Sequence, residues 1–104
     1  PTGRKIGERE AYEVDMERVL EAAARTKTAM EINAHPSRLD LNGRWARRAK
    51  ELEVKLAINT DAHSTCGLMA IEYGIKTARR GWLEEKDVLN TLGIADLLKY
   101  LDKV

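Results

Sequence analysis

The chain has 104 residues, 43% of them hydrophobic and 34% charged, with 18 lysines and arginines against 17 acidic residues and a formal net charge of +1. This length and composition are typical of one soluble α-rich or α/β domain, or a piece of one, and exclude a fibrous or disordered chain. The net charge gives no indication of nucleic-acid binding by bulk electrostatics, so any DNA contact must be local.

The single cysteine, Cys66, excludes an intrachain disulfide and is compatible with a reducing compartment, so we expect a cytoplasmic protein. No apolar run approaches the roughly 20 residues of a membrane span, so we expect no membrane partner. The chain begins with Pro1 and has no initiator methionine, which we interpret as the start of a fragment.

The first predicted elements are a helix and a strand. Asp15 is a candidate N-cap, and apolar residues at three- and four-residue steps after it predict a helix over 16–26. The pattern then changes to a period of two, which predicts a short strand over 28–33. Glu31 and Asn33 lie on its polar face.

A second helix and a second strand follow. Asn42 is a candidate N-cap, and apolar residues at i, i+4 and i+7 predict a helix that ends near Leu52. Residues 55–60 again alternate and predict a strand, with Leu56 on one side and Asn59 on the other.

Three more helical segments are predicted in the second half. One begins at Ser64 or Thr65, and Gly74 either ends it early or kinks it. Residues 83–90 predict a short helix, and residues 95–101 predict a terminal one.

Strands that alternate with helices predict parallel βα units with right-handed crossovers. Two strands cannot complete a sheet, so the predicted fold class is α/β, as a partial (βα) barrel whose earlier units lie upstream of Pro1. Strands that lack their neighbours have open edges, and we expect self-association through these open barrel edges.

Asp61 and His63 follow the second predicted strand directly, where βα folds place functional groups. Two residues apart, they can return to the same side of the chain, and their oxygen and nitrogen atoms can chelate one divalent metal ion. The alternative, in which Asp61 caps the next helix and His63 packs or faces solvent, stays open on local sequence alone.

Further candidates for lining the same cavity are the polar-face residues Glu31, Asn33 and Asn59. Arg38 is a candidate phosphate contact through a forked pair of hydrogen bonds, although a surface salt bridge with Asp40 or a neighbour is the commoner outcome. His35 lies in a loop beside a proline and receives no role, and Cys66 is interpreted as a buried residue at a helix start.

Several motifs occur in an order that resembles a known family. They are PTGR at 1–4, EINA at 31–34, RLDL at 38–41, INTDAHS at 58–64 and ARRGWL at 78–83. Together they resemble the carboxyl-terminal part of the polymerase and histidinol phosphatase (PHP) domain found in bacterial and archaeal family X DNA polymerases. The resemblance covers nearly all of residues 1–104.

The resemblance implies the closing arc of a distorted seven-stranded, TIM-like barrel that holds divalent metal ions such as manganese, zinc or magnesium. Asp61 and His63 match the family's final two ligands, and the other ligands belong to earlier segments. Clustered metals hydrolyse phosphodiesters, so the implied activity of the parent protein is 3′-5′ exonuclease or related end processing of DNA during repair. The 104-residue fragment would lack a complete site and be inactive by itself.

Two other functions stay open. One is a stand-alone phosphoesterase that acts on small phosphate esters, and the other is a non-catalytic module that binds DNA or another partner through basic helices. Two positions also depart from the family pattern. Glu53 stands where glycine is usual, so a left-handed helix end there would cost about 1 kcal/mol or be avoided, and His35 stands where asparagine is common.

Overall fold

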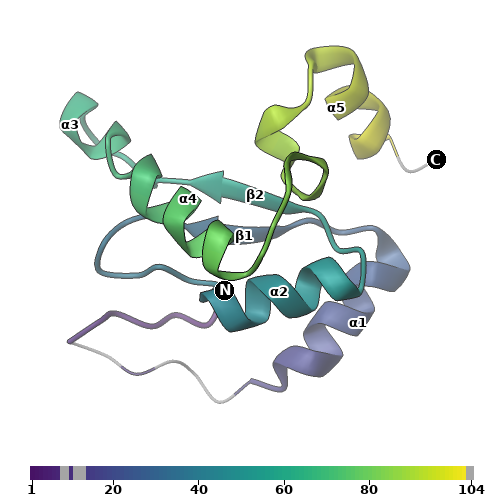
Figure 1. The fold of residues 1–104 in the computed structure, drawn as a ribbon, viewed down its shortest axis with the longest axis horizontal. Coiled ribbons are helices and arrows are strands. Elements are labelled where there is room, and N and C mark those ends of the chain that lie inside the picture. Colours follow the sequence, from purple (N-terminus) through teal and green to yellow (C-terminus); the bar gives the residue numbers. More distant parts are fainter. Residues whose placement is uncertain (8–9, 11–13, 103–104) are drawn as a thin grey trace.

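A two-stranded parallel sheet lies at the centre of the molecule, and helices α1, α2 and α4 lie on one side of it (Figure 1). The computed structural model describes residues 1–7, 10 and 14–102. Within these ranges no helix is long and apolar enough to cross a membrane. The α/β class and the parallel sheet predicted from the sequence are confirmed.

The first helix forms where its cap and its periodicity predict it. Helix α1 spans Met16–Thr26, and the Asp15 side chain accepts a hydrogen bond from the backbone N–H of Arg18 at 3.2 Å. Lys27, the C-cap residue that follows α1, has the left-handed conformation. Strand β1 (Met30–Asn33) begins two residues later than expected.

The next two elements also follow the local signals. Helix α2 spans Gly43–Glu51, and Asn42 Oδ1 accepts the N–H of Trp45 at 3.0 Å. Strand β2 (Leu56–Asn59) then pairs with β1 in parallel, with Asn33 opposite Asn59. Both strands therefore end at the same edge of the sheet, which is where a βα fold presents its functional loops.

The predicted third helix is divided into α3 (Thr65–Leu68) and α4 (Ile71–Arg80). The interruption precedes Gly74, which lies buried inside α4 and does not end it. A Cβ atom at Gly74 would lie 2.5 Å from Ile58 Cγ2 and 2.6 Å from Ala34 Cβ. The glycine therefore allows α4 to pack closely on the sheet.

The prediction of a helix over residues 83–90 is wrong. Two short 3-10 turns, η1 (Glu85–Asp87) and η2 (Leu89–Thr91), occupy this segment. Val88 between them is extended because it forms a parallel bridge to Leu56 of β2. A tertiary contact thus overrides the local helical pattern. The terminal helix α5 (Ile94–Leu101) forms as predicted, one residue earlier.

The two faces of the sheet differ as the alternating pattern predicts. Ile32, Leu56 and Ile58 are buried and pack in the hydrophobic core with α1, α2 and α4. On the opposite face, Asn59 Nδ2 donates a hydrogen bond to Glu31 Oε2 at 3.2 Å. The helices thus cover the apolar face, and polar side chains occupy the other.

Irregular segments pair with both outer edges of the sheet. On β1, the N–H of Asn33 donates to the carbonyl of Asp40 at 2.6 Å, and the N–H of Asp40 donates back at 3.3 Å. On β2, the Asn90 side chain accepts from the N–H of Ile58 and donates to its carbonyl, both at 2.8 Å. The open edges on which we based the expectation of self-association are therefore occupied at these positions.

Candidate functional site

A pocket of about 370 Å³ opens at the carboxyl ends of both strands. Its lining consists of Lys5, Asn33, His35, Ser37, Arg38, Asp61 and His63. The loops after β1 and β2 and the amino-terminal segment all contribute to it. The pocket therefore contains both predicted metal ligands, the predicted phosphate contact and one of the three predicted cavity residues.

Asp61 and His63 are exposed at this pocket. Asp61 has a φ of 54°, a left-handed conformation that aspartate tolerates better than most residues, and the chain turns there after β2. Asp61 does not cap α3, because the Ser64 hydroxyl accepts the N–H of Gly67 at 3.3 Å. Among the described residues neither side chain has a hydrogen-bond partner. The carboxylate oxygens of Asp61 and the ring nitrogens of His63 are therefore free to bind a ligand.

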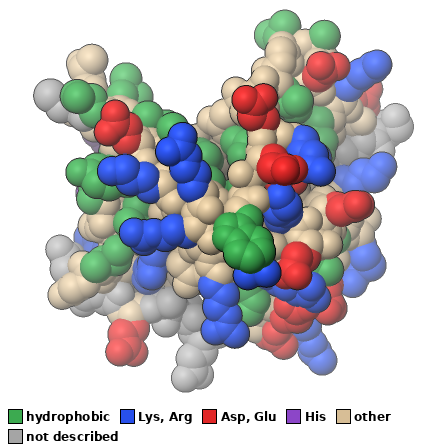
Figure 2. All heavy atoms as spheres, viewed as in Figure 1, with side chains coloured by type: hydrophobic (Ala, Val, Ile, Leu, Met, Phe, Trp, Pro, Cys, Tyr) green, Lys and Arg blue, Asp and Glu red, His purple; other side chains and the backbone are tan. Residues whose placement is uncertain are grey.

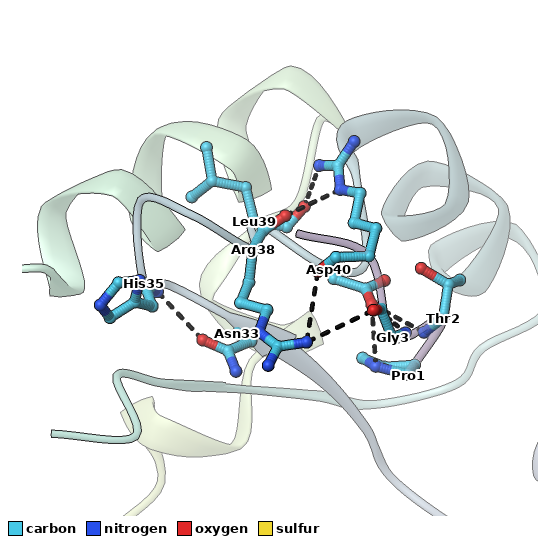
Figure 3. A network of polar contacts seen from close by, with 9 residues as sticks. Pro1, Thr2, Gly3, Asn33, His35, Arg38, Leu39 and Asp40 are labelled. Atoms are coloured by element: carbon cyan, nitrogen blue, oxygen red, sulfur yellow. Dashed lines mark hydrogen bonds and ion pairs between the residues drawn. The ribbon is translucent and has the colours of Figure 1, made fainter. Parts of the chain in front are cut away.

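Of the predicted cavity residues, only Asn33 lines the pocket. Glu31 and Asn59 are bonded to each other on the polar face of the sheet and lie outside the lining. Asn33 Oδ1 accepts the backbone N–H of His35 at 3.0 Å and so orders the loop after β1 (Figure 3).

His35, to which the sequence analysis assigned no role, lies in the same pocket. Its Nδ1 accepts the backbone N–H of Ser37 at 3.1 Å and lies 2.8 Å from the Ser37 hydroxyl. With Nδ1 as an acceptor, the neutral ring carries its proton on Nε2. His35 is thus suited to donate a hydrogen bond to an anionic oxygen.

Arg38 connects the loop after β1 to the amino-terminal segment. Its Nη1 lies 3.4 Å from the carbonyl oxygens of Gly3 and Arg4 and donates to both. In return Arg4 donates from Nε to the Arg38 carbonyl at 2.7 Å and from Nη2 to the Leu39 carbonyl. A guanidinium has five N–H donors, so Arg38 keeps most of them for a ligand.

Asp40 does not form the predicted alternative salt bridge with Arg38. It is 2% exposed, and its Oδ2 accepts the N–H groups of Thr2 at 2.7 Å and Gly3 at 3.0 Å (Figure 3). Asp40 therefore holds the segment that brings Lys5 to the pocket, and Lys5 is a lining residue that the sequence analysis missed.

The donor set can hold part of the coordination sphere of a divalent ion. Asp61 supplies carboxylate oxygens and His63 an imidazole nitrogen, which are ligand types for zinc or manganese. No group of three or more His, Cys, Asp or Glu side chains within metal-binding reach occurs in the described residues. The side chain of Cys66 lies outside the described part. The lysine and arginine of the lining add positive charge suited to a phosphate.

No family model matches the chain. The DNA polymerase/3'-5' exonuclease PolX of Bacillus subtilis (strain 168) is 45% identical to it over 103 residues, which are 99% of this chain and 18% of that protein. Probable phosphatases of Thermoanaerobacter sp. (strain X514) and Thermoanaerobacter pseudethanolicus (strain ATCC 33223 / 39E) are each 31% identical over 96 residues, 86% of this chain and 39% of those proteins.

The chain thus spans less than half the length of each of these relatives. The similarity to PolX nevertheless extends over 103 of the 104 residues of the chain. The chain is therefore similar along its whole length to a segment of PolX, a DNA polymerase/3'-5' exonuclease. This similarity confirms the resemblance that the motifs of the chain predicted.

Proposed function

We propose that residues 1–104 form the carboxyl-terminal part of a PHP-type phosphoesterase domain that hydrolyses the 3′ ends of DNA with the help of divalent metal ions. The observation that carries the proposal is the pocket at the strand ends, where Asp61 and His63 lie with Lys5 and Arg38. In this proposal the two strands belong to the closing arc of a TIM-like barrel, and the rest of the protein supplies the other metal ligands.

Each pocket residue has a distinct task in this proposal. Asp61 and His63 would hold a divalent ion such as manganese, zinc or magnesium, which when bound activates water and neutralises phosphate charge. Arg38 and Lys5 attract the DNA backbone, and His35 donates its Nε2 proton to a phosphate oxygen. Asp40 is a positioning residue, because it fixes the amino-terminal segment against the Arg38 loop.

The 45% identity to an exonuclease supports DNA as the substrate. A second candidate function is hydrolysis of small phosphate esters, which the 31% identity to probable phosphatases supports. Both functions use the same pocket, so assays on the two substrate classes distinguish them. A protein that hydrolyses p-nitrophenyl phosphate faster than a DNA 3′ end would favour the second candidate.

The test uses the complete protein that contains this chain. Asp61→Asn and His63→Ala are each expected to lower manganese-dependent 3′-5′ exonuclease turnover by at least about 100-fold, since even the partners of metal ligands matter by 10–100-fold. Nucleotide addition should stay within twofold or so of the unaltered protein.

Arg25→Gln on α1, outside the pocket lining, is the matched control and should change neither activity. The isolated 104-residue chain should bind manganese weakly and hydrolyse little. Full exonuclease activity in either pocket variant, or robust activity of the isolated chain, would refute the assignment of Asp61 and His63 to a shared metal site.

A further inference from the structure

The first half of α2, the end of α4 and the residues just after α4 carry a basic and aromatic surface that shares no residue with the pocket at the strand ends. Figure 2 shows Lys and Arg side chains over these two helices, with a large hydrophobic side chain among them. A hollow of about 530 Å³ there has Arg44, Arg47 and Arg80 in its lining, and Arg47 also contacts Trp82. We call Arg44, Arg47, Arg80 and Trp82 the arginine–tryptophan patch.

Two glycines allow the helices to meet at this surface. A Cβ at Gly43 would lie 2.8 Å from Arg80 Cβ, and a Cβ at Gly81 would lie 2.8 Å from the carbonyl oxygen of Gly43. The start of α2 and the end of α4 therefore touch along their backbones. The arginines of the two helices are held on one surface by this contact, so their spacing does not depend on a flexible loop.

The acidic residues of the hollow act on a different arginine. Glu17 accepts from Arg48 Nε at 2.9 Å, which lowers the pKa of Glu17 and raises that of Arg48. Glu51 also stabilises the charge of Arg48 and so raises its pKa. Within the described ranges, no ion pair joins the three arginines of the patch to a carboxylate. Their charges are available to an anionic partner.

Trp82 combines an exposed side chain with a backbone conformation that is unfavourable for almost any residue except glycine, and neither feature stabilises the fold. It is 64% exposed, and its φ of 62° lies in the left-handed region that favours glycine. The Arg47 guanidinium carbon lies 3.7 Å from the centre of the indole ring. An exposed indole beside an arginine offers a flat surface on which a nucleobase can stack.

We propose that the arginine–tryptophan patch binds single-stranded DNA, with the arginines on successive phosphates and a base stacked near Trp82. Arginine recognises phosphate through paired hydrogen bonds, and stacking on an aromatic ring suits unpaired bases of any sequence. An acidic peptide such as poly-glutamate would match the charge but would have no aromatic ring to stack on the indole. The patch thus forms a contact for the DNA strand that is separate from the hydrolytic pocket.

The test measures the Kd of a fluorescently labelled poly(dT) of about 20 nucleotides by fluorescence anisotropy. The complete protein that contains this chain is titrated into the DNA in EDTA, at about 50 and 200 mM salt. EDTA removes divalent ions, so failure of the proposed metal site cannot change the result. Trp82→Gly removes the ring but suits the left-handed backbone, so the melting temperature should hold or rise while the Kd rises about tenfold.

Arg44→Gln and Arg80→Gln should each weaken binding and lower the salt slope by about 0.7, the value for one phosphate contact on a single strand. Arg25→Gln, with the same charge change at an exposed residue of α1, should have at most a small effect. Equal weakening by Arg25→Gln, unchanged affinity of a folded Trp82→Gly variant, or displacement of the DNA by poly-glutamate as readily as by unlabelled poly(dT) would overturn the proposal.

Discussion

Replacing Glu53 by glycine is expected to stabilise the fold. Glu53, which follows the C-cap residue Leu52 of α2, has a φ of 63°. The helix therefore has the left-handed end that we expected to be either costly or avoided at this position. The N–H of Glu53 donates to the carbonyl of Lys50 at 3.0 Å, and the N–H of Val54 donates to that of Ala49 at 2.8 Å. These two bonds are those of a Schellman helix end, which requires the left-handed residue.

The magnitude follows from the backbone. An L residue with a Cβ costs about 1–2 kcal/mol in the left-handed conformation. Glycine removes this cost but loses about 0.5–1 kcal/mol through the greater freedom of the unfolded chain. The expected net gain is therefore about 0.5–1 kcal/mol, or about 2–8 °C in melting temperature for a domain of this size.

Thermal unfolding followed by circular dichroism measures the gain, with Glu53→Ala as the matched control. Alanine removes the same charge and the same side-chain atoms beyond Cβ but keeps the strained backbone, so it should give little or no stabilisation. Equal stabilisation by alanine and glycine would show that charge, and not backbone strain, limits stability at this position. Destabilisation by glycine would refute the left-handed helix end itself.

Three further predictions concern packing, the sheet edge and pH. Gly74→Ala should destabilise by about 1–3 kcal/mol in urea unfolding, since its Cβ would overlap the core, whereas Gly93→Ala, with no atom within 4 Å of its added Cβ, should not. Asn90→Ala should lower the unfolding free energy by about 1–3 kcal/mol and increase the sedimentation coefficient at high concentration, because it exposes the edge of β2. The hydrogen bonds from Arg48 lower the pKa of Glu17, so their stabilisation is present at neutral pH and is lost as the pH falls below the ordinary glutamate value of about 4.3. Melting temperatures of the unaltered chain and Glu17→Gln should thus differ at pH 7 and converge near pH 3, and a constant difference would contradict this.

The elements that the sequence predicted well are those whose signals are local. Asp15 and Asn42 cap α1 and α2 through side-chain bonds to residues three positions ahead, and such bonds can be inferred from spacing alone. The segment 83–90 was predicted wrongly because Val88 is extended by pairing with a strand about 30 residues earlier. Local helical periodicity contains no information about that contact.

The candidate site likewise contains residues that local signals predicted and residues that the sequence did not identify. Asp61 and His63 were found because they follow a strand directly, and strand ends in βα folds have a known location. Lys5 was not assigned, because its place depends on bonds such as that from the N–H of Gly3 to Asp40, across 37 residues of chain. His35 was not assigned although its own bonds, to Asn33 and Ser37, are local. The available signal in the sequence was Asp40 between two leucines of the RLDL motif, because a carboxylate that is buried with apolar neighbours needs donors from elsewhere in the chain.

The two covered edges of the sheet also differ in when they become protected during synthesis. Asp40 follows Asn33 closely, so the outer edge of β1 can pair almost as soon as both residues leave the ribosome. Asn90 lies 32 residues after Ile58, and at about 5–20 residues per second its arrival takes roughly 2–6 s. During those seconds the backbone of β2 is exposed on that side, so the nascent chain is most prone to aggregate through β2, and a chaperone would have to protect that edge first.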